Sequence, residues 1–395
     1  MKQVPLFTIL LALCCASAIE AAPVAITPGF SDYQPSVIRT QEGVRLLVFE
    51  RLDGSAWGNL WITRSSDGGE TWSAPQPIIA TSANERHPAL LELAPSRSPS
   101  DLDGRGENSA ARGRIIDDAP ACSGAAGQEA AEIPHRADGS AARPCQVRQA
   151  PGYALFYLKG TGSTASYRIM RATSGDGLTF TEQGALNLGW ASGGEINPHV
   201  IRHADGTLTM SYQRLGAGSY IARSFDGGVS WDTLRTPIAT GSQLPRITYR
   251  ESDGLYLASY QVGSTALSMH IKTTTNPYDW STIPQDFASN GNHHDSLPVV
   301  MPDGAFAVFW IAANGSQFDL RVRRSLDGFA WQPTRVITST PTEDDVQPHP
   351  LVGDSAVMLE LYWGRAAPVG QNNFRIVRDA AVAVMDDVLF ADGFE

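Results

Sequence analysis

A short turn-forming motif recurs along this chain at nearly constant spacing, and it constrains the fold more than any other feature. It reads SSDGGETW at 65–72 and SFDGGVSW at 224–231, with shorter copies SGDGLTF at 174–180 and SLDGFAW at 325–331. A degenerate copy, TTNPYDW, occupies 274–280. The last four copies start at 174, 224, 274 and 325, so they are 50, 50 and 51 residues apart. Self-similarity near 50 residues predicts a propeller or a solenoid.

A second recurring feature, a proline ahead of an apolar run, indicates the number of repeats. It occurs six times, at Pro35, Pro88, Pro198, Pro245, Pro298 and Pro348. Two further strand-like runs separate each proline from its turn motif, such as TLTMSYQR and SYIARS in the third repeat. Each repeat is therefore predicted to form four antiparallel strands, which make one blade. We expect an all-β, six-bladed propeller over residues 23–385, with the N-terminal PVAITPG beside the last strand of the final blade.

The turn motif is predicted to connect the third and fourth strands of a blade. Its Asp can accept hydrogen bonds from the backbone of its own turn, and its Gly permits a positive φ. The Trp is expected to begin the fourth strand and to cover the apolar edge between blades. These turns resemble the Asp boxes, or BNR repeats, of sialidases and related six-bladed propellers. The resemblance implies a structural role, on the face opposite the active site, for Ser65, Asp67, Gly69, Trp72, Ser174, Asp176, Ser224, Asp226, Trp231, Ser325, Asp327 and Trp331.

Composition is consistent with a soluble globular protein. The chain has 395 residues, a net charge of −11 and 42% apolar residues, which is ample for a large core. The acidic balance argues against nucleic acid as a partner. We expect a monomer without a membrane span or a cofactor.

The two ends of the chain suggest export. Residues 1–22 combine a short positive start, an apolar core and small residues at a cleavage site, which predicts a signal peptide and a periplasmic or extracellular protein. Residues 386–395 form an acidic tail, which resembles the endings of some secreted proteins of Gram-negative bacteria.

One segment breaks the repeat pattern. Residues 95–151 are rich in Ala, Gly, Ser, Arg and Asp and poor in aromatic residues, which predicts a loosely ordered insertion between the first two strands of blade 2. We expect it to be peripheral, on the face of the turn motifs. Cys122 and Cys145 lie within it, and in an oxidising compartment we expect them to form a disulfide.

Candidate functional residues gather at the end of the propeller opposite the turn motifs. The first strand of each blade starts there and the second strand ends there, so six blades converge on one axis. They form a funnel of carboxylates, cations and aromatic rings, suited to acid/base chemistry, anion binding and stacking on sugars. From the strand starts we predict these substrate-binding residues: Glu85, Arg86, His87, Asn197, Gln243 and His294. From the strand ends we predict these: Arg51, Arg214, Trp310 and Arg365.

The resemblance to sialidases extends incompletely to catalysis. Sialidases hydrolyse terminal sialic acid with three arginines for the sugar carboxylate, a Tyr nucleophile primed by a Glu, and an Asp acid/base. Blade positions make Tyr362 the candidate nucleophile, Glu195 its partner and Asp32 the acid/base, with Asp295 a further catalytic carboxylate. The arginine motif of the first blade, F/Y-R-I-P, reads DYQPSV here, with Gln34 in place of the arginine. A neutral amide cannot form the bidentate ion pair.

The leading prediction is a secreted exo-sialidase-type glycoside hydrolase acting on a glycan. Two alternatives stay open. One is a non-catalytic propeller that binds carbohydrate or protein, and the other is a polysaccharide lyase, in which a His or Tyr base acts beside an Arg. Several histidines share the funnel end, but His293 and His294 are adjacent in a strand and point to opposite faces. No metal site is therefore predicted.

Overall fold

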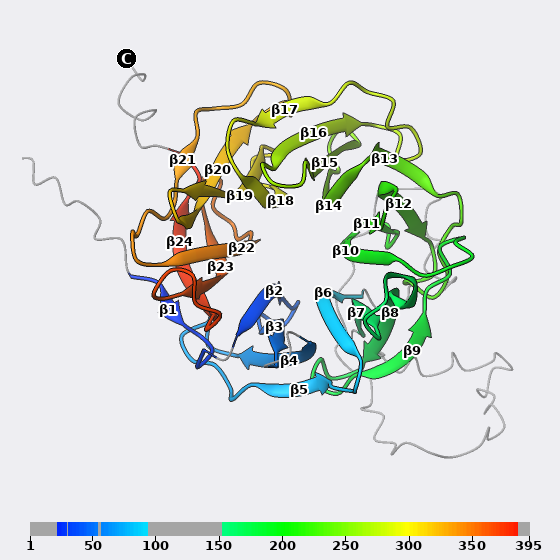
Figure 1. The fold of residues 1–395 in the computed structure, drawn as a ribbon, viewed down its shortest axis with the longest axis horizontal. Helices are drawn as coiled ribbons and strands as arrows, with labels where there is room; N and C mark the ends of the chain where they lie inside the picture. Colours follow the sequence, from blue (N-terminus) through cyan, green and yellow to red (C-terminus); the bar gives the residue numbers. More distant parts are fainter. Residues whose placement is uncertain (1–21, 30, 54–56, 94–151, 386–395) are drawn as a thin grey trace, which may run out of the picture.

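The computed structural model describes residues 22–29, 31–53, 57–93 and 152–385, and it confirms the predicted fold class (Figure 1). Six four-stranded antiparallel sheets surround a central axis as the blades of a propeller. Within these residues the only helical element is a single 3-10 turn at Thr164–Ser166, and no helix has the length and apolar character to cross a membrane. The predicted signal peptide up to residue 21, the insertion with Cys122 and Cys145, and the tail lie outside the described residues.

The strands follow one another from the axis outward in each blade. Blade 1 contains β2 (Asp32–Arg39), β3 (Arg45–Leu52), β4 (Gly58–Ser65) and β5 (Gln76–Ile79). Blade 2 contains β6 (Asn84–Glu92), β7 (Tyr153–Gly160), β8 (Arg168–Ser174) and β9 (Thr181–Ala185). Blade 3 contains β10 (Glu195–Arg202), β11 (Leu208–Arg214), β12 (Gly218–Ser224) and β13 (Thr236–Thr240). Blade 4 contains β14 (Ser242–Arg250), β15 (Leu255–Val262), β16 (Ser268–Thr274) and β17 (Gln285–Ala288). Blade 5 contains β18 (His293–Val300), β19 (Phe306–Asn314), β20 (Gln317–Ser325) and β21 (Arg335–Val336). Blade 6 contains β22 (Asp344–Leu351), β23 (Met358–Ala366), β24 (Arg375–Ala383) and β1 (Val24–Ala25).

Blade 6 closes the ring with strands from both ends of the chain. The N-terminal β1 pairs antiparallel with β24, so the first strand of the sequence supplies the outermost strand of the last blade. This confirms the position expected for the N-terminal segment. Figure 1 shows the blue β1 beside the red β24. The closed ring leaves no gap between the last and first blades, which packs every blade on two neighbours.

The apolar core is divided among the junctions between blades. Each of six clusters draws its buried side chains from two neighbouring blades. For example, Phe156 of blade 2 packs with Met210 and Trp231 of blade 3. Most residues of each second strand are buried, which in β19 matches a nearly continuous run of apolar residues, whereas β11 also buries Thr209 and Ser211.

The repeated turns, here named the C–D turns, share one hydrogen-bond pattern. In blade 1, Ser65 Oγ donates to Asp67 Oδ1 at 2.8 Å, and the Gly69 N–H donates to Ser65 Oγ at 2.8 Å. Asp67 also accepts the Thr71 N–H at 3.0 Å. The indole N–H of Trp72 donates to the Gly69 carbonyl at 3.1 Å. The turn therefore satisfies its polar groups internally.

The other C–D turns repeat this pattern with small changes. In blade 3, Trp231 Nε1 donates to Gly228 O at 3.1 Å, and its ring meets Phe156 of blade 2 edge-on at 5.5 Å. In the degenerate copy of blade 4, Asn276 takes the place of the Asp and accepts the Tyr278 N–H at 3.0 Å. The indoles cover the junction between blades, as expected. They do not begin the fourth strand, because β5 starts at Gln76, four residues after Trp72.

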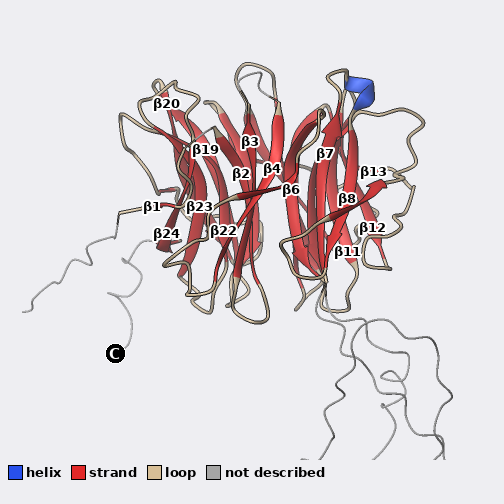
Figure 2. Ribbon diagram, turned by 90° about the horizontal axis from the view of Figure 1, so that it is seen from below, coloured by secondary structure: helices blue, strands red, loops and turns tan. Residues whose placement is uncertain are grey.

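The insertion interrupts the connection between β6 and β7. Its flanking residues are held together, since the Leu93 N–H donates to Gly152 O at 2.7 Å. Tyr153 pairs with Ser174, the first residue of a C–D turn, so Leu93 and Gly152, which flank the insertion, lie at the end of the propeller that carries these turns. Seen from the side, the propeller has its connecting loops at two ends (Figure 2).

Candidate functional site

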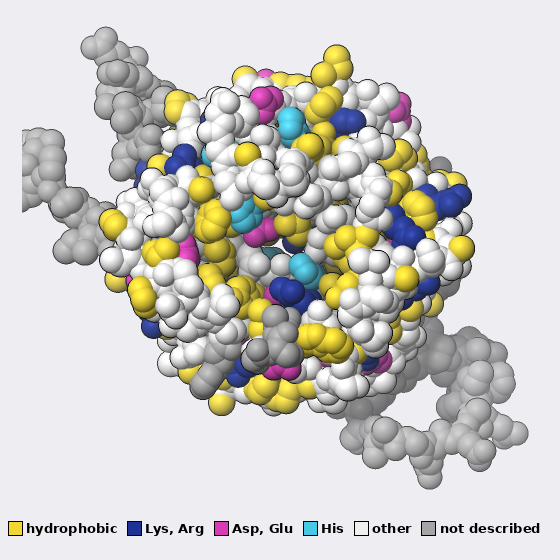
Figure 3. All heavy atoms as spheres, in the orientation of Figure 1, with side chains coloured by type: hydrophobic (Ala, Val, Ile, Leu, Met, Phe, Trp, Pro, Cys, Tyr) yellow, Lys and Arg dark blue, Asp and Glu magenta, His cyan; other side chains and the backbone are white. Residues whose placement is uncertain are grey.

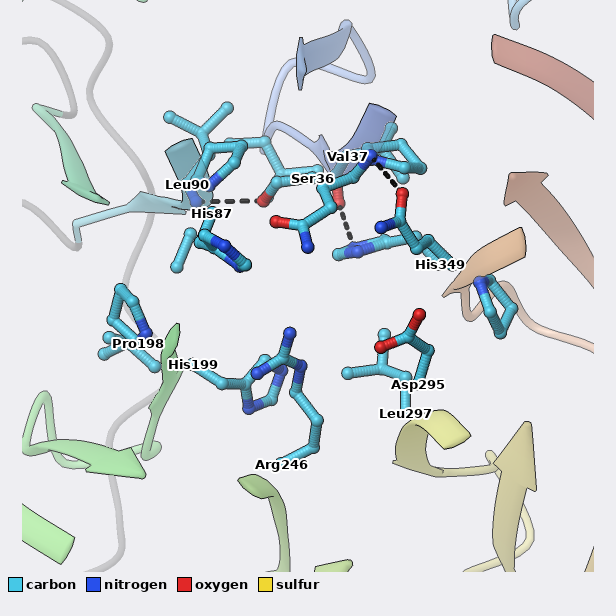
Figure 4. Close-up of a pocket in the computed structure, with 18 of the residues that line it drawn as sticks. Ser36, Val37, His87, Leu90, Pro198, His199, Arg246, Asp295, Leu297 and His349 are labelled. Carbon is cyan, nitrogen blue, oxygen red and sulfur yellow. Dashed lines mark hydrogen bonds between the residues drawn. The ribbon is translucent and has the colours of Figure 1, made fainter. Parts of the chain in front are cut away.

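A cavity lies on the propeller axis. It has a volume of about 200 Å³ and is lined by the six innermost strands, β2, β6, β10, β14, β18 and β22. In the space-filling view, basic, acidic and histidine side chains surround a central opening (Figure 3). Figure 4 shows the side chains that project into the cavity.

The backbone that positions these side chains is a β-bulge repeated in all six innermost strands. At each bulge the pairing with the second strand shifts, and one non-glycine residue has a positive φ between 46° and 58°. The six residues are Gln34, His87, Asn197, Leu244, Asp295 and Gln347. A bulge removes a ladder hydrogen bond and re-aims the neighbouring side chains. The bulges therefore turn this part of each strand toward the axis.

Proline follows the bulge residue in five of the six strands, because a proline costs little where the ladder lacks a hydrogen bond. The fifth blade differs. Its bulge residue is Asp295 and the next residue is Ser296, so the predicted marker Pro298 stands two positions farther along the strand. The six prolines thus identify the correct strands, but Pro298 is not equivalent to the other five.

Side-chain acceptors at the ends of second strands stabilise several bulges from the preceding blade. Glu50 accepts the His87 N–H at 3.1 Å, and Gln261 accepts the Asp295 N–H at 3.3 Å. In the same way Gln213 accepts the Leu244 N–H at 3.2 Å. These bonds link blades 1 to 2, 3 to 4 and 4 to 5 around the cavity. They hold the lining rigidly, as a binding site requires.

Arg246 is the cation of the cavity. Its Nη1 donates to the carbonyls of Pro245 at 3.1 Å and Asn197 at 3.4 Å, and within the described residues no carboxylate forms an ion pair with it. Burial lowers the pKa of Arg246 to about 10, while the charge of Asp295 opposes this shift. Arg246 remains protonated at neutral pH. It therefore presents a charged guanidinium whose strongest natural partner, an anion, is not supplied by the protein.

Three imidazoles surround this guanidinium. Burial, with the charge of Arg246, lowers the pKa of His349 to about 4 and holds the pKa of His199 well below 6.5. Burial also lowers the pKa of His87, with Arg86 and Arg246 adding to the effect. All three side chains are neutral at pH 7. Figure 4 shows His87 and His349 facing Arg246 across the cavity.

Backbone groups select the tautomers of two of these imidazoles. The Ile247 N–H donates to His199 Nδ1 at 3.3 Å, so the proton of a neutral His199 is on Nε2. His349 Nε2 lies 3.2 Å from Val37 O, which requires Nε2–H and leaves the lone pair on Nδ1. Elsewhere in the lining, Gln34 Oε1 and His87 Nδ1 are buried without a hydrogen-bond partner.

Asp295 is the one carboxylate among the described residues that line the cavity. Its Oδ2 lies 3.4 Å from His294 Nδ1, and the side chain projects toward the cavity in Figure 4. With His87 it is one of two residues predicted from the sequence that reach the lining. The cavity thus combines one cation, one anion, neutral imidazoles and amides, a set that can bind an anionic polar ligand and move a proton.

Most other predicted residues lie around the cavity in ion pairs. Asp32 is fully buried against Arg51, at 2.5 Å, and Glu195 contacts Arg168 at 2.9 Å and Arg214 at 3.3 Å. Three further pairs have the same character, namely Arg86 with Glu50, Lys159 with Glu85, and Arg365 with Asp345. These carboxylates and cations neutralise one another, which leaves them less available for a ligand.

The remaining predicted residues serve packing or local bonding. Tyr362 is fully buried beside Trp72, and its hydroxyl donates to Glu360 at 2.8 Å, away from the cavity. Trp310 is buried and donates to His293 Nδ1 at 3.3 Å. Gln243 donates to Gly263 O at 3.1 Å, and Asn197 donates to Gln213 Oε1 at 2.8 Å.

Sequence reasoning did not select Arg246, His199 or His349 as site residues. A signal was present, because each of the three directly follows a proline of the recurring marker. That position faces the axis only because of the bulge, and the bulge could not be located from a single sequence. In the described residues, no group of three or more His, Cys, Asp or Glu side chains is arranged to hold a metal ion.

The chain was compared with known families, curated protein sequences and solved structures, and only the solved structures match. No family model matches the sequence, and no curated protein sequence matches it. Solved structures do match. A protein of unknown function from Dyadobacter fermentans superposes with a TM-score of 0.62 at 11% identity, over 92% of this chain and 98% of that chain.

Two glycosidases superpose similarly. An α-L-arabinofuranosidase from Fusarium graminearum has a TM-score of 0.58 at 12% identity, over 92% of this chain and 99% of that chain. The Hadza microbial sialidase Hz136 has a TM-score of 0.57 at 13% identity, over 89% of this chain but 65% of the sialidase chain. At these identities the likeness shows the fold. The chain has the six-bladed propeller fold of sialidases and other glycosidases.

Proposed function

We propose that this protein acts on the end of a glycan, with one sugar unit bound in the axial cavity. The observation that carries the proposal is the cavity lining, where a guanidinium without a counter-ion, a carboxylate and neutral imidazoles converge on one small space. Sugars offer hydroxyls to such groups, and an acidic sugar also offers an anion to Arg246. The glycosidase fold supports the same substrate class.

The size of the cavity favours action at a chain end. Its volume of about 200 Å³ lies below the ~300–1,000 Å³ of sites for drug-sized ligands. One sugar ring is therefore the expected occupant, with the rest of the glycan leaving through the mouth. We propose cleavage of the glycosidic bond of the terminal sugar. The sialidase-type hydrolysis predicted from the sequence is one form of this reaction, and the experiment below includes a sialoside to test it.

A non-catalytic binding propeller is the second candidate, because one specific observation favours it. The predicted catalytic carboxylates Asp32 and Glu195 are in ion pairs, and Tyr362 is buried away from the cavity. Retaining glycosidases that use two carboxylates hold them ~5–5.5 Å apart. Asp295 has no second carboxylate beside it in the described lining.

The test is a glycan array followed by cleavage assays on bound glycans, with a fluorogenic sialoside included. We expect binding of an acidic glycan by the wild type, and at least a tenfold loss in Arg246→Gln. The matched control is Arg202→Gln. It removes an exposed arginine from the end of β10 that is distant from the bulge at Asn197. Binding that survives Arg246→Gln, or no glycan binding at all, contradicts the proposal. Binding without any cleavage selects the second candidate.

The predicted signal peptide supports a place of action outside the cytoplasm. We therefore propose a periplasmic or extracellular glycan as the target. Expression of the full chain in a Gram-negative host, followed by fractionation, checks this, since the mature protein is then expected outside the cytoplasmic fraction and shortened at its N-terminus.

A further inference from the structure

The axial cavity carries groups that suit a reaction other than hydrolysis. Hydrolysis by paired carboxylates needs two acidic groups, and the described lining offers Asp295 alone, without a tyrosine. Instead, three neutral imidazoles face a charged guanidinium. A general base next to a cation is the arrangement that removes a proton from carbon beside a carboxylate, because the cation stabilises the negative charge that develops.

We propose that the cavity binds the carboxylated ring of a 4-linked uronic acid and cleaves its glycosidic bond by elimination. This inference rests on the glycan-binding function proposed above and specifies its sugar and its chemistry. Arg246 binds the uronate carboxylate through the nitrogens that face the cavity. His199, whose proton is on Nε2, donates a second hydrogen bond to the same group.

His349 is the base in this reaction. Its Nε2–H donates to Val37 O, so the lone pair of the neutral ring is on Nδ1, the nitrogen that accepts the proton in this proposal. Nδ1 removes the proton from C5 of the uronate, the electron pair of that bond forms a double bond between C4 and C5, and the bond from C4 to the glycosidic oxygen breaks. The imidazolium then returns its proton to that oxygen. No water is consumed, and His349 ends as it began.

The same groups explain why the base is neutral before the reaction. Arg246 and burial both disfavour a second proton on His349. When the uronate carboxylate binds, its negative charge offsets that of Arg246, and protonation of His349 becomes easier at the moment it is needed. Asp295, which comes from the blade between those of Arg246 and His349, accepts hydrogen bonds from ring hydroxyls (Figure 4).

The experiment incubates the full mature chain with polygalacturonate, alginate, glucuronan and hyaluronan in water labelled with heavy oxygen. Elimination yields a product with an unsaturated uronate, which absorbs in the ultraviolet and carries no label. Hydrolysis yields a saturated product that is one water heavier and carries the label. We expect the unlabelled, unsaturated product from at least one of the four polymers.

Two variants test the residues. His349→Gln is expected to lower turnover by ~100-fold or more, with binding of the polymer retained. The matched control, His270→Gln, removes a histidine that stacks on Tyr260 away from the cavity, and full activity is expected. Circular dichroism checks that each variant is folded. If His349→Gln is unfolded, Arg246→Gln serves in its place, with loss of both binding and turnover expected.

The outcomes separate this inference from the proposed function. Labelled, saturated products from any glycan overturn elimination and leave the glycan-cleaving function standing. Binding of a uronate polymer without cleavage, or full activity in His349→Gln, also overturns it. If no glycan is bound or cleaved, the proposed function fails together with the inference.

Discussion

The two ends of the propeller use repetition in different ways. At the C–D turns both the backbone and the residues recur, so Ser, Asp, Gly and Trp return at matching positions in several blades. At the axial end the backbone bulge recurs six times, while its residues change from blade to blade among Gln, His, Asn, Leu and Asp. Repeated side chains indicate a shared structural task. A repeated backbone with varied side chains provides a scaffold on which a site can be built.

The two ends also differ in how many of their polar side chains have hydrogen-bond or ion-pair partners. In the C–D turn of blade 1, the carboxylate of Asp67, the hydroxyl of Ser65 and the indole of Trp72 all have partners. In the cavity, Arg246 lacks a counter-ion within the described residues and His87 Nδ1 is buried without a partner. Positive φ at six non-glycine residues adds strain. One end is organised for stability, and the other retains unsatisfied groups that a ligand can satisfy.

The largest expected effect tests the structural end. Trp231→Ala is expected to lower the free energy of unfolding by ~3–5 kcal/mol, because a buried indole is lost from the junction with Phe156. Urea unfolding measures the change. Phe225→Ala is the matched control, since this aromatic of the same turn is 70% exposed and its loss is expected to change stability by less than ~0.5 kcal/mol. A Trp231→Ala loss below ~1 kcal/mol contradicts the structural role.

The pH dependence of stability should separate the two ends. The pKa of His349 falls from 6.5 to about 4 on folding, so the unfolded chain binds more protons between these values. Stability should therefore fall as pH drops from about 6.5 to 4, by ~2 kcal/mol or more from this residue. Hydrogen bonds from Thr71 and Ser65 lower the pKa of Asp67, so its stabilisation is present above pH 4 and lost below it.

Unfolding curves at several pH values check this separation. His349→Gln should make the loss above pH 4 shallower, while His87 and His199 keep their own share of it. Asp67→Asn should lower stability at pH 7 and make the loss below pH 4 shallower. Equal slopes for wild type and His349→Gln between pH 6.5 and 4 would show that this imidazole does not resist protonation in the folded protein.

A third comparison replaces a glycine of a C–D turn by alanine and a non-glycine bulge residue by glycine, both at positions with a positive φ. A Cβ added at Gly69, whose φ is +87°, would lie 2.7 Å from Arg378 Cζ, so Gly69→Ala is expected to cost ~1–3 kcal/mol. Gln34→Gly at the cavity removes a strained residue with a φ of 47° and is expected to change stability by less than ~1 kcal/mol. Thermal unfolding compares the two, and an equal loss in both would show that the bulge depends on its side chain.

The smallest expected effect has the opposite sign. Arg246→Met removes a charge that has no protein counter-ion, so the free energy of unfolding should rise by ~0.5–2 kcal/mol. Glycan binding should be lost in the same variant. A clear fall in stability would indicate that Arg246 is retained for the structure and would weaken the case for a ligand.

Much of the fold was predictable because its signals are local. The spacing of the turn motif and the six prolines predict six blades, and the alternation of apolar runs predicts four strands in each. The site was less predictable. Asp295 and His87 were selected for their position near a strand start, but the same reasoning selected Asp32 and Glu195, which the structure places in ion pairs. Ion pairing depends on the residue opposite in the sheet, such as Arg51 opposite Asp32.

The sequence by itself determined the number of blades and the chemistry of the C–D turns, because these depend on residues close together in the chain or on a period repeated along it. Only the tertiary structure decided which side chains meet on the axis. Arg246, His199 and His349 come from three different blades, and each reaches the cavity through a one-residue bulge in its strand. Since successive residues of a strand point to opposite faces, a shift of one residue decides whether a side chain faces the cavity or a neighbouring blade.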